Sequence, residues 1–172
     1  NGIDVVTAVE GCNRYTKDST PPELTGFDVN MSDETITFSF SETVDAAMLA
    51  PTEIMLTNGP VSDPSTSGAY RLTAGTVALW SFEVVVFSFN RTDLNQIQVI
   101  DTLLTAESTT LLTLTTRDGP FIVDMVGLHI VPNLATDEPV GTYTPDRVAP
   151  ILERFTLNLD GNHDYLELSF DE

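Results

Sequence analysis

A short loop near the end of the chain carries oxygen-bearing side chains at alternate positions. Asp160, Asn162 and Asp164 stand in the stretch DGNHD, and many calcium-binding loops begin with this spacing. Such a loop needs glycine at its sixth position, where this chain has Tyr165. The same stretch is rich in turn-forming residues and lies where a hairpin turn is needed. We expect a plain turn here, with Asp160, Asn162 and Asp164 as the candidate calcium ligands.

Carboxylates also gather near the predicted boundaries between structural units. They are Asp18, Glu138, Asp146 and Asp164. We expect a solvated acidic surface here; the alternative is a calcium ion shared by such residues, which would join neighbouring domains. We expect no cofactor, with calcium as the open alternative.

Residues that commonly perform catalysis form no recognisable arrangement. His129 lies in an apolar stretch typical of a packed strand, and His163 lies in a turn. Cys12 is the only cysteine, and a nucleophilic role would need a nearby histidine that nothing indicates. No triad order, phosphate loop or metal-ligand spacing is present. We therefore expect no enzymatic activity.

Two sequons for N-linked glycosylation begin at Asn30 and Asn90, in the stretches NMS and NRT. Both asparagines end a predicted strand, where a glycan can project into solvent. We predict glycosylation at both positions, and glycans are therefore among the expected partners.

The charge of the chain excludes several classes of partner. Its 172 residues include 26 acidic and 7 basic ones, for a net charge of -19. Such a surface repels phosphate backbones and anionic lipids, so we expect no binding to nucleic acid. No apolar run approaches the roughly 20 residues of a spanning helix, so we expect no membrane insertion. The acidity also suits an extracellular protein, which it keeps soluble.

The elements that position these side chains are mostly strands, because apolar residues recur with a period of two. Phe27, Val29 and Met31 alternate with polar residues, and so do Ile36, Phe38 and Phe40. The run VVVF at 84–87 predicts a central strand covered on both faces, with Trp80 and Phe82 in the same part of the core. Helical signals are brief, at 44–49 and 92–97. Short strands between turn clusters predict an all-β, antiparallel sandwich.

An internal repeat sets the domain organisation. Residues 15–30 match residues 143–158 at seven of sixteen positions with an offset of 128, and SFSE at 39–42 matches SFDE at 169–172 with an offset of 130. The pattern is typical of tandem copies of one domain. We predict the tail strand of a preceding repeat and a linker over 1–20, a complete unit over 21–148, and the first hairpin of the next repeat over 149–172.

The predicted hairpin carries a large apolar face. Its members are Phe155, Leu157, Leu159, Leu166, Leu168 and Phe170. A lone two-stranded hairpin is marginal in water, and burying these side chains would contribute roughly 1.5 to 3 kcal/mol each. We expect this face to be an assembly interface, covered by a segment of another copy that contains Ile3 and Val5, or by an array continuing along the chain.

The stretches PPELTGFDVN, FSFSETVDAAML, TDLNQIQ and IVDMVG resemble, in this order, the Ig-like tandem repeats of large extracellular proteins. These include surface-layer and adhesin proteins of bacteria and relatives in algae and other protists. The family's Phe-Ser-Glu-Pro-Val-Asp stretch is matched from Phe40 to Asp45, with Thr43 in place of the proline. Its Asp-x-x-Gly-Asn stretch is matched at Asp124 and Gly127, with Leu128 in place of the asparagine. These departures leave open the turn geometry and any cation site there.

The resemblance implies an Ig-like β-sandwich with Greek-key connections and a structural or adhesive role on the cell surface, without catalysis. With the incomplete repeat, it predicts a subunit of an extracellular glycoprotein filament or stalk whose copies assemble head to tail by sharing strands. The alternative is a calcium- or carbohydrate-binding module of a cell-surface adhesin.

Overall fold

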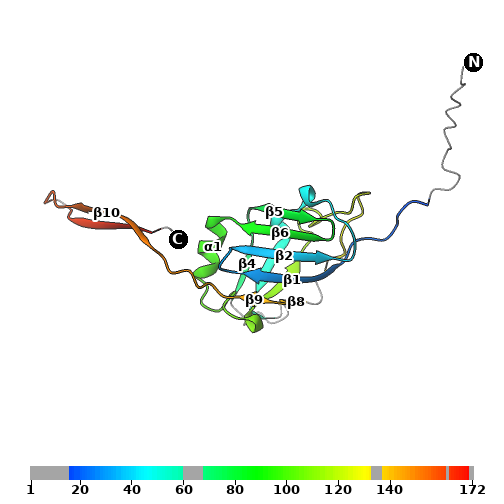
Figure 1. The fold of residues 1–172 in the computed structure, drawn as a ribbon, viewed down its shortest axis with the longest axis horizontal. Helices are drawn as coiled ribbons and strands as arrows, with labels where there is room; N and C mark the ends of the chain where they lie inside the picture. The colour runs from blue at the N-terminus through cyan, green and yellow to red at the C-terminus, as the bar shows by residue number, and fades with distance from the viewer. Residues whose placement is uncertain (1–15, 60–67, 133–136, 162, 171–172) are drawn as a thin grey trace, which may run out of the picture.

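Strands form where threonine, serine and valine alternate with large apolar residues, because this pattern gives one buried and one solvated face. The computed structural model describes residues 16–59, 68–132, 137–161 and 163–170. Within these ranges the chain is built from strands, short 3-10 turns and one α-helix (Figure 1). The all-β prediction is confirmed.

One sheet has five strands, in the order β5-β6-β2-β1-β9. They are β5 (Gly75–Ser81), β6 (Val84–Phe89), β2 (Thr35–Phe40), β1 (Leu24–Asn30) and β9 (Tyr143–Thr144). All neighbours are antiparallel except β1 and β9, which run parallel with Val29 opposite Tyr143. The last strand of this sheet therefore lies beside the first.

The second sheet has four strands, in the order β4-β3-β7-β8. They are β4 (Ala69–Arg71), β3 (Ile54–Thr57), β7 (Leu111–Leu114) and β8 (Glu138–Pro139), all antiparallel. Phe27, Phe38 and Phe87 from the first sheet share one buried cluster with Leu56 and Leu112 from the second. The two sheets thus form a sandwich around a single core; its Greek-key connections stay a prediction.

Short helical elements join the sheets. The 3-10 turns are η1 (Ala46–Met48), η2 (Pro51–Glu53) and η3 (Glu107–Thr109), and the α-helix is α1 (Arg91–Gln98). The helical turns predicted at 44–49 and 92–97 correspond to η1 and α1. Asn90 caps α1, since its Oδ1 accepts a hydrogen bond from the backbone N–H of Asp93 at 2.6 Å.

Two expectations about the aromatic region are wrong. Val84 and Val86 on β6 are half-buried, so this strand is covered on one face only. Trp80 and Phe82 are 43% and 68% exposed, because β5 is the edge strand of its sheet and Phe82 stands in the turn that follows it. Phe87 and Phe89 do belong to the core.

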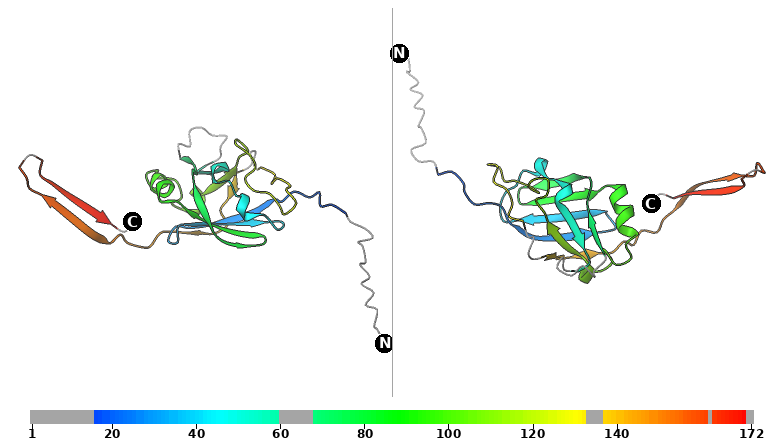
Figure 2. Two further views of the ribbon diagram at one scale, coloured as in Figure 1. Left: turned by 90° about the horizontal axis from the view of Figure 1, so that it is seen from above. Right: turned by 180° about the vertical axis from the view of Figure 1, so that it is seen from behind.

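The remaining strands, β10 (Leu152–Asn158) and β11 (Tyr165–Phe170), form a separate antiparallel hairpin. In every view it stands away from the sandwich, and the N-terminal segment reaches the sandwich at the opposite end (Figures 1 and 2). The helix α1 lies at the end of the sandwich nearest the hairpin.

Buried carboxylates hold the loops of the sandwich. Asp93 is fully buried and accepts hydrogen bonds from Tyr70, from the hydroxyl and N–H of Thr73 and from the N–H of Ala74, at 2.7 to 3.1 Å. Burial alone would raise its pKa, but these donors outweigh burial and lower it. Burial and the adjacent Asp93 raise the pKa of Tyr70 to about 12.

Glu53 is held in the same way. It accepts hydrogen bonds from the hydroxyl of Thr115 and from the backbone N–H groups of Arg117 and Asp118. Its pKa is lowered because these donors, with the charge of Arg71, outweigh burial. Both carboxylates therefore support the fold in their ionised form.

Replacing Asp93 by asparagine should lower the free energy of unfolding at pH 7 by about 2 to 3 kcal/mol, because charge-assisted hydrogen bonds are lost and an NH₂ group can face backbone donors. Because the pKa of Asp93 is lower in the folded state, ionised Asp93 stabilises the fold fully at pH values above its unfolded pKa of about 3.9. This stabilisation is lost as the pH falls through the folded pKa. The difference in free energy of unfolding between D93N and the unaltered chain should therefore shrink in acid.

Urea unfolding from pH 7 to pH 2 measures this difference, with the exposed Asp101→Asn as control. A deficit independent of pH would contradict this assignment.

Candidate functional site

The hairpin β10–β11 presents its large apolar residues on one face. Phe155 lies opposite Leu168 and Leu157 lies opposite Leu166 in the register of the two strands. Polar pairs such as Thr156 and Glu167 alternate with them, so the other face is hydrophilic. The predicted alternation is thus present in the structure.

The hairpin repeats the register of β1 and β2 residue by residue. Phe27 lies opposite Phe38 as Phe155 lies opposite Leu168, and both hairpins shift register at one place, after Leu24 in the first and after Leu152 in the second. The connecting turns are 31–34 and 159–164, so the two additional residues of the second copy lie in its turn. The repeat in sequence is therefore also a repeat in strand pairing.

Burial separates the two copies. Six apolar residues of the first copy are between 0% and 7% exposed, namely Phe27, Val29, Met31, Ile36, Phe38 and Phe40. Their counterparts in the second copy are between 47% and 70% exposed, namely Phe155, Leu157, Leu159, Leu166, Leu168 and Phe170. Side chains of the same kind, on the same register, form a core in one hairpin and face solvent in the other.

Neighbouring strands account for this difference. In the sandwich β6 pairs with the outer edge of β2, β9 pairs with the outer edge of β1, and the second sheet covers the apolar face. Among the described residues, β10 and β11 pair only with each other. A two-stranded hairpin in this state is marginal in water.

Other predicted site residues have local roles. Asp160 and Asp164 accept backbone hydrogen bonds within the hairpin turn, from His163 and Gly161 respectively. Their calcium role stays a prediction. Asn162, Ile3 and Val5 lie outside the described residues.

Of the two sequon asparagines, Asn30 ends β1 and Asn90 directly follows β6, and both are partly exposed. Asn90 uses its Oδ1 as the cap of α1, which leaves Nδ2 as the atom that a glycan would occupy. The Nδ2 of Asn30 donates to Asp33 at 2.7 Å. Glycosylation at either residue stays a prediction.

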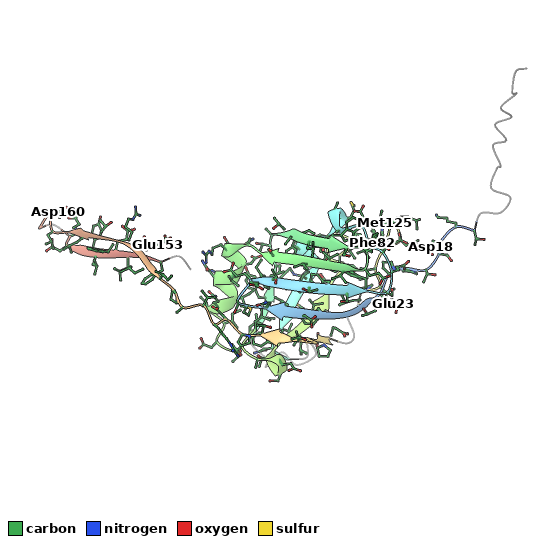
Figure 3. The ribbon with its side chains drawn as sticks, viewed as in Figure 1. Asp18, Glu23, Phe82, Met125, Glu153 and Asp160 are labelled. Atoms are coloured by element: carbon green, nitrogen blue, oxygen red, sulfur yellow. The ribbon has the colours of Figure 1, made fainter. Side chains whose placement is uncertain are left out.

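A second feature is a pocket of about 300 Å³ at the end of the sandwich where the linker meets β1. Asp18 from the linker, Glu42 from the bend after β2 and Asp124 from its β-bridge with Val44 each place one carboxylate oxygen within 4.8 Å of the others. Figure 3 labels Asp18 and Met125 at this end, opposite the hairpin. Three segments distant in the sequence thus form one acidic group.

Backbone contacts fix this arrangement. The backbone N–H of Glu23 donates to the hydroxyl of Ser41, and the backbone N–H of Ser41 donates to the carbonyl of Glu23, both at 2.9 Å. These bonds hold the linker. The segment that contains Asp124 is held because the backbone N–H of Asp45 donates to the carbonyl of Val123 at 2.8 Å. The carboxylates are therefore brought together by the fold itself.

Sequence reasoning found one member of this acidic group and missed two. The alternative hypothesis of a shared cation placed Asp18 with Glu138, Asp146 and Asp164, whereas the described part of the chain groups Asp18 with Glu42 and Asp124. Glu42 and Asp124 did stand in the two motifs that carry the family resemblance. Only their position in that resemblance could have signalled them, because no local spacing joins them.

Comparisons with known proteins give one distant likeness in structure. No family model matches the chain, and no curated protein matches it. The N-terminal part of the bacterial S-layer protein SbsC resembles it with a TM-score of 0.43 and 13% sequence identity, over 81% of this chain and 26% of that one. The tandem Ig-like relationship stays a prediction. In the described part of the chain, no helix is long and apolar enough to cross a membrane.

Proposed function

We propose that the protein is a structural, non-catalytic unit of an extracellular glycoprotein array on the cell surface, whose units join head to tail through the hairpin β10–β11. The observation that carries this proposal is the exposed apolar face of the hairpin, at positions whose counterparts form the core of the sandwich. In this proposal the hairpin is the first pair of strands of a unit that another copy helps to complete.

The hydrophobic effect supplies the driving force. Phe155, Leu157 and Leu168 belong to a set of six exposed side chains, and covering each would contribute roughly 1.5 to 3 kcal/mol. The outer edges of β10 and β11 also offer backbone hydrogen bonds to an added strand. The segment containing Ile3 and Val5 is the candidate strand, because it precedes the linker as the end of a preceding unit would.

Geometry then decides what kind of assembly forms. The hairpin projects from one end of the sandwich, and the linker from residue 16 to β1 lies at the opposite end (Figure 1). A contact between these two different surfaces is heterologous, so it leaves a free surface at each end of the growing assembly. Such contacts build a filament.

Replacing Phe155 by aspartate should abolish this association, because a charge would have to be buried at the centre of the contact. The matched control is Thr156→Asp, which adds the same charge on the polar face of the same strand. Sedimentation velocity over a range of concentrations measures the result. The unaltered chain and T156D should form larger species as concentration rises, whereas F155D should stay monomeric. A chain that is monomeric at every concentration would contradict the proposal.

Salt should strengthen the association. Each copy carries a net charge of -19, so approach of two copies is opposed by repulsion that ions screen within about 10 Å at 0.1 M salt. Raising sodium chloride from 0.02 to about 0.5 M should therefore lower the concentration at which larger species form. Weaker association at high salt would instead indicate a contact built on ion pairs.

A further inference from the structure

The acidic pocket contains carboxylate oxygens that receive no hydrogen bond from the part of the chain that the structure describes. Asp124 is 3% exposed, and its Oδ1 accepts hydrogen bonds from the N–H groups of Val126 and Leu128 at 2.9 and 2.7 Å. Its Oδ2 is buried and has no hydrogen-bond partner among the described residues, and the same holds for Oε1 of Glu42. A buried charged oxygen without a donor is costly, and nearly all such groups in proteins have a partner.

The lining of the pocket offers no compensating positive charge. Its described residues are Asp18, Ser41, Glu42, Thr43, Glu83, Asp124, Met125 and Val126, without a lysine, arginine or histidine. Burial, followed by the neighbouring charges of Asp18 and Asp124, raises the pKa of Glu42. A cation between these carboxylates would provide both the missing charge and the missing partner.

We propose that Asp18, Glu42 and Asp124 bind a calcium ion. All the side chains of the group offer oxygen, which hard cations such as calcium prefer, whereas zinc and copper sites favour histidine and cysteine. Calcium takes 6 to 8 oxygen ligands in flexible geometry, so water and the hydroxyls of the lining complete the shell. The buried, unpartnered Oδ2 of Asp124 is the observation that distinguishes this group from an ordinary acidic surface.

The ion would join the linker to the sandwich. Asp18 belongs to the linker before β1, whereas Glu42 and Asp124 belong to the sandwich. Bound calcium therefore fixes the direction in which the linker leaves the sandwich. All three carboxylates belong to one chain, so the site does not depend on association through the hairpin.

The sequence repeat extends to two of these residues. Asp146 and Glu172 stand at the offsets of 128 and 130 that place them on Asp18 and Glu42. The linker turn is also repeated: Asp18 Oδ1 accepts from the N–H of Thr20 at 3.0 Å, and Asp146 Oδ1 accepts from the N–H of Val148 at 2.8 Å.

Calcium titration of the chain after removal of metal with EDTA tests the proposal, at 0.15 M salt. The unaltered chain should bind calcium saturably, and Asp124→Asn should weaken binding by roughly tenfold or more, because asparagine keeps the Oδ1 acceptor but loses the ligand charge. Glu42→Gln is a second variant with the same expected result. Glu23→Gln removes an exposed charge near the pocket, and Asp160→Asn alters the hairpin turn; neither should change the affinity.

The rate of proteolytic cleavage next to Asp18 is an independent measure of calcium binding. Lys17 is the only lysine of the chain and precedes Asp18, so endoproteinase Lys-C cuts the protein at this one bond. Calcium should slow this cut severalfold in the unaltered chain and in E23Q, but not in D124N or E42Q. Magnesium, which gives up its own water reluctantly, should protect only at much higher concentration.

Three results would overturn the calcium site: no saturable binding by the unaltered chain, equal affinity in D124N and E23Q, or loss of binding in D160N alone. Circular dichroism and urea unfolding of each variant separate loss of the site from loss of the fold. Failure of association through the hairpin would leave these results unchanged.

Discussion

A β-hairpin with one apolar face is stable only when other strands cover that face and occupy its edges, since two strands alone bury too little surface. This constraint governs both ends of the molecule. In the sandwich, β1 and β2 meet it because β6, β9 and the second sheet surround them. In β10 and β11 the same register and the same kinds of side chain occur without these neighbours among the described residues. This difference in burial is the observation on which the proposed association of units depends.

Polar groups in the interior follow a parallel rule. Glu53 and Asp93 are buried with a full set of donors, and their pKa values are lowered. Among the described residues, Glu42 and Asp124 each have a buried oxygen without a donor, and the pKa of Glu42 is raised. The first pair stabilises loops of the sandwich by itself. The described part of the chain places no positive charge beside the second pair, and we assign it to calcium because a cation would supply that charge.

The strands and the apolar face of the hairpin could be predicted from the sequence. Both the alternation of apolar residues and the offset of the repeat can be recognised without knowledge of the fold. It failed where neighbours decide burial. The run at 84–87 reads as a fully buried strand, yet Val84 and Val86 face outward because only one face of the sheet is covered. Trp80 is large and apolar but belongs to an edge strand.

The acidic pocket also could not be predicted from the sequence. Asp18, Glu42 and Asp124 have no shared spacing, and only the fold brings their oxygens within 4.8 Å. Sequence reasoning could place Asp18 at a junction and the other two in turns. It could not join them, because this requires the path of the linker across the end of the sandwich.

Hydrogen–deuterium exchange of the hairpin amides tests the central claim most directly. If β10 and β11 are completed by strands of another copy, the amides on their outer edges should become more protected as the protein concentration rises, because added strands occupy those edges. The amides at the centre of the sandwich, on β2 and β6, should be unaffected. Exchange of the hairpin that stays the same at concentrations where larger species form would contradict the account.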